Sequence, residues 1–458
     1  MGLLYLIYAL MMGAFLLYTT PPLQTPDAIA HFFRAIQVAD GHVFAEKFDG
    51  TAGGKIDVAA VKLAVLYNPM AFHPAVKETA TLRAQSALLR WGEPRVKTPF
   101  PNTSMYPAFS YLPQVLAIGV GRAVGASVRD TYVLTCAFGL LFSVAITALA
   151  IGLARRTSLI LFAVALLPTT LMIDSSVSQE VTVLPVCILI VAIIDRFITD
   201  QRPMTGRWMA LLVAMYVITA SARPPYAGLI LLWFHPEVVV SRDQRYGAGR
   251  RLTLAAISAM LSVISIVTFG HFGLVEFGPP HSTKGQLLHV LQHPGFLLQV
   301  AFNTLSVQGP FYVHSFIGAL GWLDTYFDGA FYLAVLLMLL LAIVASCLYA
   351  YPKAQRTPAG DLVTVAAGSS STLLIFASLY LAWSPVGGSV VEGVQGRYFL
   401  PLVGLIALIV PQFCVRTTAA ASGSAERCRA VLIFLIAAFP FYTVARLVPI
   451  VVERYYLH

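Results

Sequence analysis

Long apolar segments alternate with short polar connections along most of this 458-residue chain. A helix takes roughly 20 apolar residues to cross the hydrocarbon core of a bilayer, and many segments approach that length. Because backbone polar groups need partners inside a bilayer, such segments are expected to be helical. The runs lie near residues 2–18, 107–122, 131–154, 158–173, 181–198, 208–222, 225–240, 252–272, 296–320, 330–350, 362–383, 398–415 and 430–450. We therefore predict an all-α polytopic membrane helical bundle with about ten to thirteen transmembrane helices.

One long polar stretch, residues 19–106, interrupts this alternation. Loops this long inside a compact chain are usually functional. We interpret residues 1–458 as a single integral membrane domain. In this interpretation, 19–106 form a large first loop with amphipathic helices, and 107–450 form the remaining transmembrane bundle.

Composition and charge support a membrane protein and suggest its orientation. Hydrophobic residues make up 58% of the chain and charged residues only 11%, whereas soluble domains carry roughly 25% charged residues. The formal net charge of +9 comes largely from Lys and Arg in short loops between apolar runs, and not from a nucleic-acid-binding face. The basic loops are at 155–156, 202–207, 241–251, 353–356 and 416–429.

The positive-inside rule makes these basic loops cytoplasmic. The first loop and the connections at 174–180, 221–225, 273–295, 321–329 and 384–397 then face the periplasm. This arrangement requires that 107–122, or another short run, does not fully cross the bilayer. We leave that point open, and we expect a multi-pass protein of a bacterial inner (cytoplasmic) membrane.

The most informative polar segment directly follows the first apolar run. Thr25 is a typical N-cap and Pro26 a typical first helical residue. A helix beginning there would place Asp27, His31 and Arg34 at i, i+4 and i+7 on one face. A carboxylate in the first turn could act as a general base beside cationic groups. The alternative is an amphipathic surface helix with solvated charges.

Further candidates lie in the other periplasmic connections. Arg397 could clamp a phosphate through its fork of donors, or it could extend to the interface beside Tyr398. Arg223 interrupts an apolar stretch and is a second phosphate-clamp candidate. Glu180 belongs to a polar interruption of two apolar runs, where acidic groups are costly and often functional. The remaining candidate substrate contacts are Gln395, Trp322 and Asp324. The ring of Trp322 could stack on a sugar, or it could anchor the chain at the membrane interface.

Other recognisable site patterns are lacking in the sequence. There is no phosphate-binding loop, no nucleophile elbow and no HExxH motif. The spacing of Cys and His residues does not predict a metal site. We therefore predict no metal ligands and no certain cofactor, and leave a divalent cation as an open alternative.

Four of these segments together resemble a known family. The chain is similar to the bacterial membrane proteins grouped as domain of unknown function 2142, which look like distant relatives of the GT-C membrane glycosyltransferases. The typical first-loop pattern there is P-D-E-x-x-H-F-x-R-A followed by a Gly, and this chain has P-D-A-I-A-H-F-F-R-A at 26–35 and then Gly41. The other similar segments are 106–114, 318–324 and 393–401. The resemblance runs from residue 20 to about 415.

Two departures from the family pattern bear on the site. Ala28 stands where an acidic neighbour of the Asp is usual, and Gln179-Glu180 stand where an Asp is expected after a Ser-rich stretch. A site with two carboxylates would therefore have only one of them in the first motif. This puts metal binding there in doubt.

The GT-C resemblance implies a specific activity. Such enzymes use polyprenyl-phosphate-linked sugars, invert the anomeric carbon and carry an Asp base in the first external loop. By this resemblance Asp27 is the base, and Arg397, Arg223 or Arg34 holds the donor phosphate. The acceptor would be a surface polysaccharide or a lipid-linked glycan at the periplasmic side. The alternatives are a transporter or flippase of a lipid-linked glycan, and a non-catalytic scaffold of a polysaccharide assembly complex.

Overall fold

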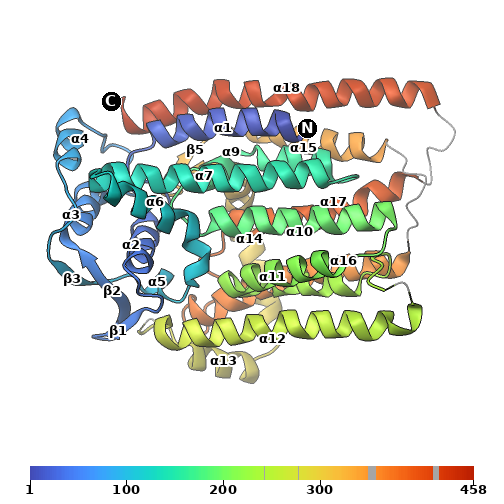
Figure 1. The fold of residues 1–458 in the computed structure, drawn as a ribbon, viewed down its shortest axis with the longest axis horizontal. Helices are drawn as coiled ribbons and strands as arrows, with labels where there is room; N and C mark the ends of the chain where they lie inside the picture. The colour runs from blue at the N-terminus through green and yellow to red at the C-terminus, as the bar shows by residue number, and fades with distance from the viewer. Residues whose placement is uncertain (242, 277, 349–356, 416–421, 458) are drawn as a thin grey trace.

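The computed structural model describes residues 1–241, 243–276, 278–348, 357–415 and 422–457. Its long helices lie side by side along one direction (Figure 1), as an all-α polytopic membrane bundle requires. Seven described helices are long and apolar enough to cross a membrane. They are α1 (Gly2–Thr19), α7 (Val128–Leu153), α10 (Glu180–Asp200), α12 (Gly247–Gly273), α15 (Gly329–Cys347), α16 (Pro358–Ala382) and α18 (Ser422–Tyr455).

Shorter apolar helices pack among the seven long ones. They are the pair α8 (Ser158–Ala165) and α9 (Pro168–Asp174), then α11 (Gly206–Ala222), the 3-10 helix η3 (Pro224–Phe234) and α17 (Leu400–Val415). In the described residues, these shorter helices and the seven long ones together form the apolar bundle. This agrees with the expected all-α polytopic bundle.

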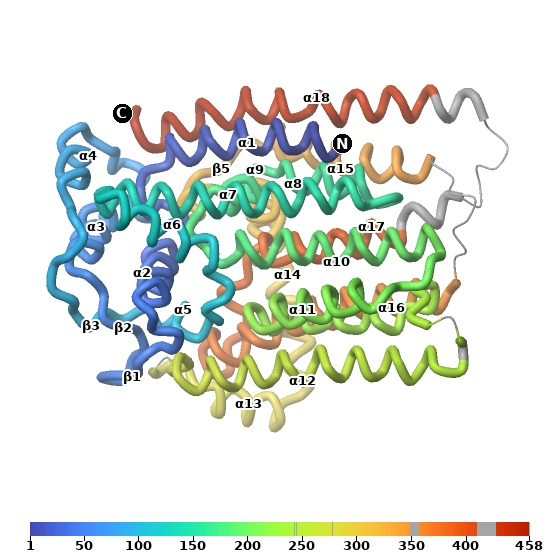
Figure 2. The backbone as a smooth tube through the Cα atoms, in the orientation of Figure 1, coloured from blue at the N-terminus to red at the C-terminus, as the bar shows by residue number. Residues whose placement is uncertain are grey.

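The bundle has two chemically different ends, which are easiest to follow in the backbone trace (Figure 2). The first loop folds at one end, which we call the site end. The connections at 154–157 and 201–205, and the described residues 235–241 and 243–246, lie at the other, which we call the basic end. Two predicted basic segments, 353–356 and 416–421, lie outside the described residues. The remaining basic connections are thus on one side of the bundle.

Two predicted apolar runs do not behave as simple crossings. The run at 107–122 forms the 3-10 helix η2 (Ala108–Tyr111) and α6 (Leu112–Ala123). At 12 residues, α6 is about 18 Å long, well short of the roughly 30 Å hydrocarbon core, and it packs against α7 and α2. The run at 296–320 is α14 (Phe296–Ile317), whose polar side chains hydrogen-bond along the segment 389–396. Asn303 donates to the carbonyl oxygen of Ser389, and Thr304 and Ser315 accept from backbone N–H groups of that segment. Both runs therefore belong to the site end.

The first loop contains a small sheet as well as the expected helices. Strands β1 (Glu46–Phe48), β2 (Thr51–Asp57) and β3 (Arg95–Pro99) pair antiparallel in the order β1-β2-β3. The helices around it are α2 (Ala28–Ala39), α3 (Val58–Tyr67), α4 (Ala80–Ala87) and α5 (Pro101–Ser104). The sheet was not predicted from sequence, because its strands are short and two glycines occupy the middle of β2.

Those two glycines allow the sheet to approach its neighbours closely. A Cβ on Gly53 would meet the carbonyl oxygen of Thr98 in β3, and one on Gly54 would meet the side chain of Gln37 in α2. Gln37 in turn donates from Nε2 to the carbonyl oxygen of Gly53 at 3.0 Å. The sheet therefore fixes α2, and with it the segment that carries Asp27.

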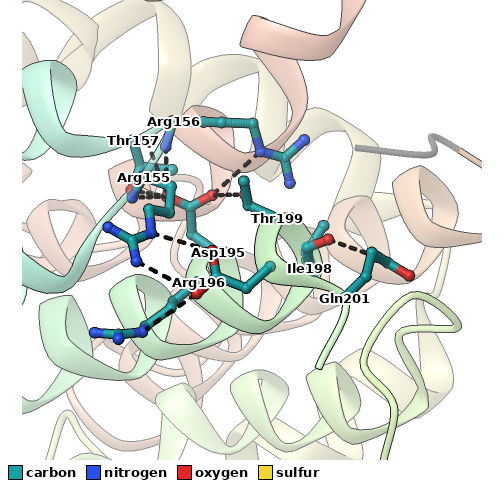
Figure 3. A network of polar contacts seen from close by, with 9 residues as sticks. Arg155, Arg156, Thr157, Asp195, Arg196, Ile198, Thr199 and Gln201 are labelled. Carbon is teal, nitrogen blue, oxygen red and sulfur yellow. Dashed lines mark hydrogen bonds and ion pairs between the residues drawn. The ribbon is translucent and has the colours of Figure 1, made fainter. Parts of the chain in front are cut away.

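Helix α10 is the central element of the bundle, because 94% of the residues in its most apolar stretch are buried. It begins at Glu180 at the site end and holds Asp195 near the basic end. Asp195 is fully buried, and its Oδ2 accepts from the backbone N–H groups of Arg155, Arg156 and Thr157 (Figure 3). This carboxylate thus satisfies the free N–H groups that precede α8. It ties α10 to the connection between α7 and α8.

Replacing Asp195 with Asn should destabilise this connection. An amide keeps the shape but loses the charge, and it offers one acceptor oxygen where several donors now converge. We expect a loss of about 1–3 kcal/mol in unfolding free energy, because buried N–H groups are left unpaired. A thermal melt of the full chain in detergent would measure it. Asp361→Asn serves as the control, because Asp361 also lies at the basic end but is partly exposed. Equal melting temperatures of D195N and wild type would contradict the role given to Asp195.

Candidate functional site

Four charged side chains from distant parts of the sequence meet at the site end. Asp27 precedes α2, Glu180 begins α10, Arg223 follows α11, and Arg397 lies in the 3-10 helix η5 (Gly396–Phe399). Arg223 Nη2 lies 2.6 Å from Glu180 Oε1, and Arg397 Nη1 lies 3.4 Å from Glu180 Oε2. Arg397 Nη2 is also 4.0 Å from Asp27 Oδ2. The structure thus brings together four of the residues predicted from sequence.

Asp27 is held in an unusual backbone conformation. It has φ 58° and ψ 13°, in the left-handed region, and it is the N-cap of α2, so the helix starts later than predicted and Thr25 is not its N-cap. Asp tolerates this region better than most residues, and such conformations concentrate at functional sites. Its Oδ1 accepts from Asn102 Nδ2 at 2.8 Å, while 43% of the side chain stays exposed. The carboxylate is therefore oriented and yet accessible.

The two arginines are largely buried and only partly paired. The side chain of Arg397 is 4% exposed and that of Arg223 is 20% exposed. The Nε atom of each is buried without a hydrogen-bond partner in the described residues. Such donors are costly to leave unpaired. Glu180 therefore holds the two guanidinium groups in place but does not use all their donors.

Aromatic rings frame these guanidinium groups. The guanidinium carbon of Arg223 lies 4.9 Å from the ring centroid of Tyr398 and 5.5 Å from that of Tyr106. The guanidinium carbon of Arg397 is 5.5 Å from the Tyr398 centroid. Tyr398 thus contacts both cations, an arrangement in which the ring quadrupole stabilises positive charge.

His31 lies behind this site and is buried. Its Nδ1 is 2.7 Å from the hydroxyl of Tyr111, and its Nε2 is 3.4 Å from the hydroxyl of Ser178. Burial, together with the charges of Arg223 and Arg397, holds the pKa of His31 well below its usual value. His31 is therefore neutral at pH 7. Of His31, Glu180 and Asp27, it is Asp27 whose side chain is the most exposed and that a solute can reach.

Arg34 does not reach the other charged residues. It is fully buried and pairs with the side chain of Gln37. It also donates to the carbonyl oxygens of Val43 at 2.7 Å and Tyr106 at 3.0 Å. Arg34 therefore fixes the backbone of Tyr106 beside the site. It was predicted to share one helix face with Asp27, but in the structure it is not one of the cations of the site.

Three other predicted residues have separate surroundings. Trp322 donates from Nε1 to the carbonyl oxygen of Leu23 at 3.1 Å, and Asp324 pairs with Arg454 of α18 at 2.8 Å. Both interactions fasten other segments to the site end. Gln395 directly precedes η5, and its Oε1 is buried with no hydrogen-bond partner in the described residues. Gln395 thus has an unused acceptor next to Arg397.

Sequence reasoning missed the residues that orient the predicted ones. Asn102 holds Asp27, and Tyr106 and Tyr111 contact Arg223 and His31 respectively. The signal in the sequence was the resemblance of 106–114 to the family, which covers Tyr106 and Tyr111. Among the residues that the structure describes, no three His, Cys, Asp or Glu side chains are placed to hold a metal ion.

Gly396 sets the position of Arg397. A Cβ on Gly396 would meet the carbonyl oxygen of Tyr312 and the backbone nitrogen of Phe316, both in α14. The Gly396 N–H also donates to Ser315 Oγ at 2.7 Å. Only glycine allows this close approach of η5 to α14.

Gly396→Ala should therefore displace Arg397 and lower the melting temperature. Overpacking of this kind typically costs about 1–3 kcal/mol. A thermal melt of the two purified proteins measures the effect. Gly309→Ala, on the same helix α14 where a Cβ meets nothing, is the control. An unchanged melt for G396A would show that α14 moves aside freely.

Comparison with known proteins gives one match. Residues 10–406 match the model of the family described as "Predicted membrane protein (DUF2142)". No curated protein and no solved structure matches the chain. All four charged residues of the site fall within the matched range. Since the match covers far more than half of the chain, this protein belongs to the DUF2142 family of predicted membrane proteins.

Proposed function

We propose that this protein is a glycosyltransferase that moves a sugar from a polyprenyl-phosphate carrier to a glycan or lipid-linked acceptor. The single observation that carries the proposal is the accessible carboxylate of Asp27 beside the buried guanidinium of Arg397, at 4.0 Å. Asp27 and the arginines together supply a base for the acceptor hydroxyl and cations for the departing phosphate. These are the two functions that displacement of a phosphate by a hydroxyl requires.

In the proposed reaction Asp27 accepts the proton of the acceptor hydroxyl. The hydroxyl oxygen then forms a bond to the anomeric carbon of the donor sugar. The bond between that carbon and the phosphate oxygen breaks, and its electron pair leaves with the phosphate. Attack from the face opposite the leaving group inverts the configuration. General-base catalysis by one such group contributes about 100- to 10,000-fold.

The arginines would stabilise the leaving phosphate. Their partly unpaired donors, fixed in a buried site before the reaction, match a group that gains negative charge as the bond breaks. Arg397 and Arg223 supply these donors, and Glu180 is a positioning residue for both. Tyr398, which contacts both cations, would line the same site.

The proposal also places the protein in a bacterial inner membrane with the site end in the periplasm. The basic end carries the Arg-rich connections, which the positive-inside rule assigns to the cytoplasm. A lipid-linked donor would arrive within the membrane, while the acceptor arrives from water past the first loop. The exposed side chain of Asp27 is accessible from that loop.

A second candidate is a flippase for a lipid-linked glycan. The observation favouring it is Asp174, which is buried at 1% exposure between the helices with its Oδ2 unpaired in the described structure. Buried carboxylates at membrane depth often mark transport pathways. The transferase remains the preferred function because no cation of the described residues lies beside Asp174 to bind a phosphate, whereas Arg397 lies beside Asp27.

The test compares a strain lacking the gene with the same strain complemented by the full chain. Surface glycans and lipid-linked intermediates from both strains are analysed by mass spectrometry. A glycan short by one sugar mass in the deletion strain, restored on complementation, is the result expected for a transferase. A complete glycan that stays on its carrier inside the cell would indicate the flippase. Complete glycans in reduced amount would indicate a scaffold of an assembly complex.

A further inference from the structure

A cavity opens at the site end between the first two long helices, α1 and α7. It has a volume of about 410 Å³ and is lined by the end of α1, the start of α7, α4 and the C-terminal segment. Leu17, Val133 and Leu134 form its apolar walls. None of the residues lining it belongs to the group of Asp27, Glu180, Arg223 and Arg397. We call this cavity the α1–α7 groove.

The groove lies on the side of the bundle that faces lipid. Helices α1 and α7 are both long enough to cross a membrane, and both present large exposed apolar side chains. On α1 these include Leu3, Ile7 and Met11, and on α7 Leu141 and Leu149. Tyr18, at the groove itself, is 80% exposed. An acyl chain could therefore pass from the bilayer directly along these helices into the groove.

The lining of the groove includes two cations and two carboxylates. Arg83 pairs with Glu78, whose carboxylate also accepts from the hydroxyls of Tyr67 and Tyr456 and is fully engaged. Arg129 is held only loosely, with its Nη1 3.8 Å from Asp130 Oδ1 and its Nε buried without a partner in the described residues. Arg83 and Arg129 thus line the groove together with one exposed carboxylate, that of Asp130.

We propose that the α1–α7 groove binds a zwitterionic phospholipid. One acyl chain would lie against Leu17, Val133 and Leu134, and the phosphate would accept hydrogen bonds from Arg129 and Arg83. The ammonium of the headgroup would pair with Asp130. Because the formal charges of the four ionic residues cancel, the groove suits a headgroup of zero net charge better than an anionic one. Charge-assisted bonds of this kind are the strong ones in proteins.

The test measures lipid binding to the full chain in detergent by native mass spectrometry. The probes are palmitoyl-oleoyl phosphatidylethanolamine, the matching phosphatidylglycerol, and inorganic phosphate. We expect the ethanolamine lipid to bind most tightly, and Arg129→Gln to weaken it about tenfold through loss of a charged hydrogen bond. Asp130→Asn should weaken the ethanolamine lipid but not the glycerol lipid. Arg90→Gln is the control. Arg90 is an exposed arginine of the first loop that does not line the groove.

A second variant separates loss of binding from loss of folding. Leu134→Trp fills the groove without changing any charge, so it should also weaken lipid binding if the chain enters there. Thermal melts identify any variant that is unfolded. Equal binding of the two lipids, wild-type binding by both R129Q and L134W, or binding of inorganic phosphate alone at the same affinity would overturn the proposal. None of these readouts depends on sugar transfer.

Discussion

Asp27→Asn is expected to lower the rate of sugar transfer about 100- to 10,000-fold while the protein stays folded. This is the largest effect we expect. The amide keeps the size of the carboxylate and can still bond to Asn102, so the orientation at this position is preserved. Asn also tolerates the left-handed backbone that Asp27 adopts. What the variant lacks is a group that can take the proton of the acceptor. The effect should therefore be on kcat and not on the amount of protein in the membrane.

The measurement is the rate of sugar transfer by the full chain in nanodiscs, with lipid-linked intermediates extracted from the deletion strain as donor. Asp49→Asn is the matched control, because Asp49 is an exposed residue of the same loop with φ 48°. It should transfer sugar at the wild-type rate. If D27N also transfers at that rate, Asp27 is not the base. If the wild-type chain itself transfers no sugar, the flippase or the scaffold becomes the better account.

Glu180→Ala is expected to destabilise the protein by about 3–5 kcal/mol. Glu180 is the common partner of Arg223 and Arg397, and its side chain is only 10% exposed. Removing it leaves two buried guanidinium groups with like charge and no shared counter-ion. Removing one partner of a buried ion pair leaves the other charge uncompensated. The resulting loss of stability is far larger than the stability that the intact pair adds over an apolar replacement. The loss should appear as a lower melting temperature and as weaker sugar transfer.

Glu93→Ala provides the control for this stability effect. Glu93 pairs with Lys62 at 2.7 Å, but the two side chains are 35% and 52% exposed. Exposed pairs contribute about 0–1 kcal/mol, so E93A should melt close to wild type. Glu180→Gln should fall between E180A and wild type, since it can still accept a hydrogen bond. A melt of E180A indistinguishable from that of E93A would mean that water, not Glu180, compensates the two arginines.

The apolar pattern was sufficient to predict the class of fold. Apolar runs near 20 residues can satisfy their backbone in a bilayer only as helices, so the polytopic bundle follows from local sequence. The runs at 107–122 and 296–320 were harder. Both leave large apolar side chains exposed, such as Leu116 and Phe302, although neither is a simple crossing. A hydropathy pattern records that a segment is apolar but not how its helix is oriented in the bundle. The small sheet β1-β2-β3 left no pattern because its strands are short and its middle strand contains glycines.

The sequence by itself determined which residue types were available: an Asp after the first span, arginines at interrupted apolar runs, and a Gly-rich turn before Arg397. It did not determine which of the arginines would meet. Arg34 is seven residues from Asp27 yet bonds to Tyr106, whereas Arg397 is 370 residues away and lies 4.0 Å from its carboxylate. Only the tertiary structure decided this, because spacing along a helix fixes neighbours within one element, while packing of α10, α11 and η5 brings distant residues together.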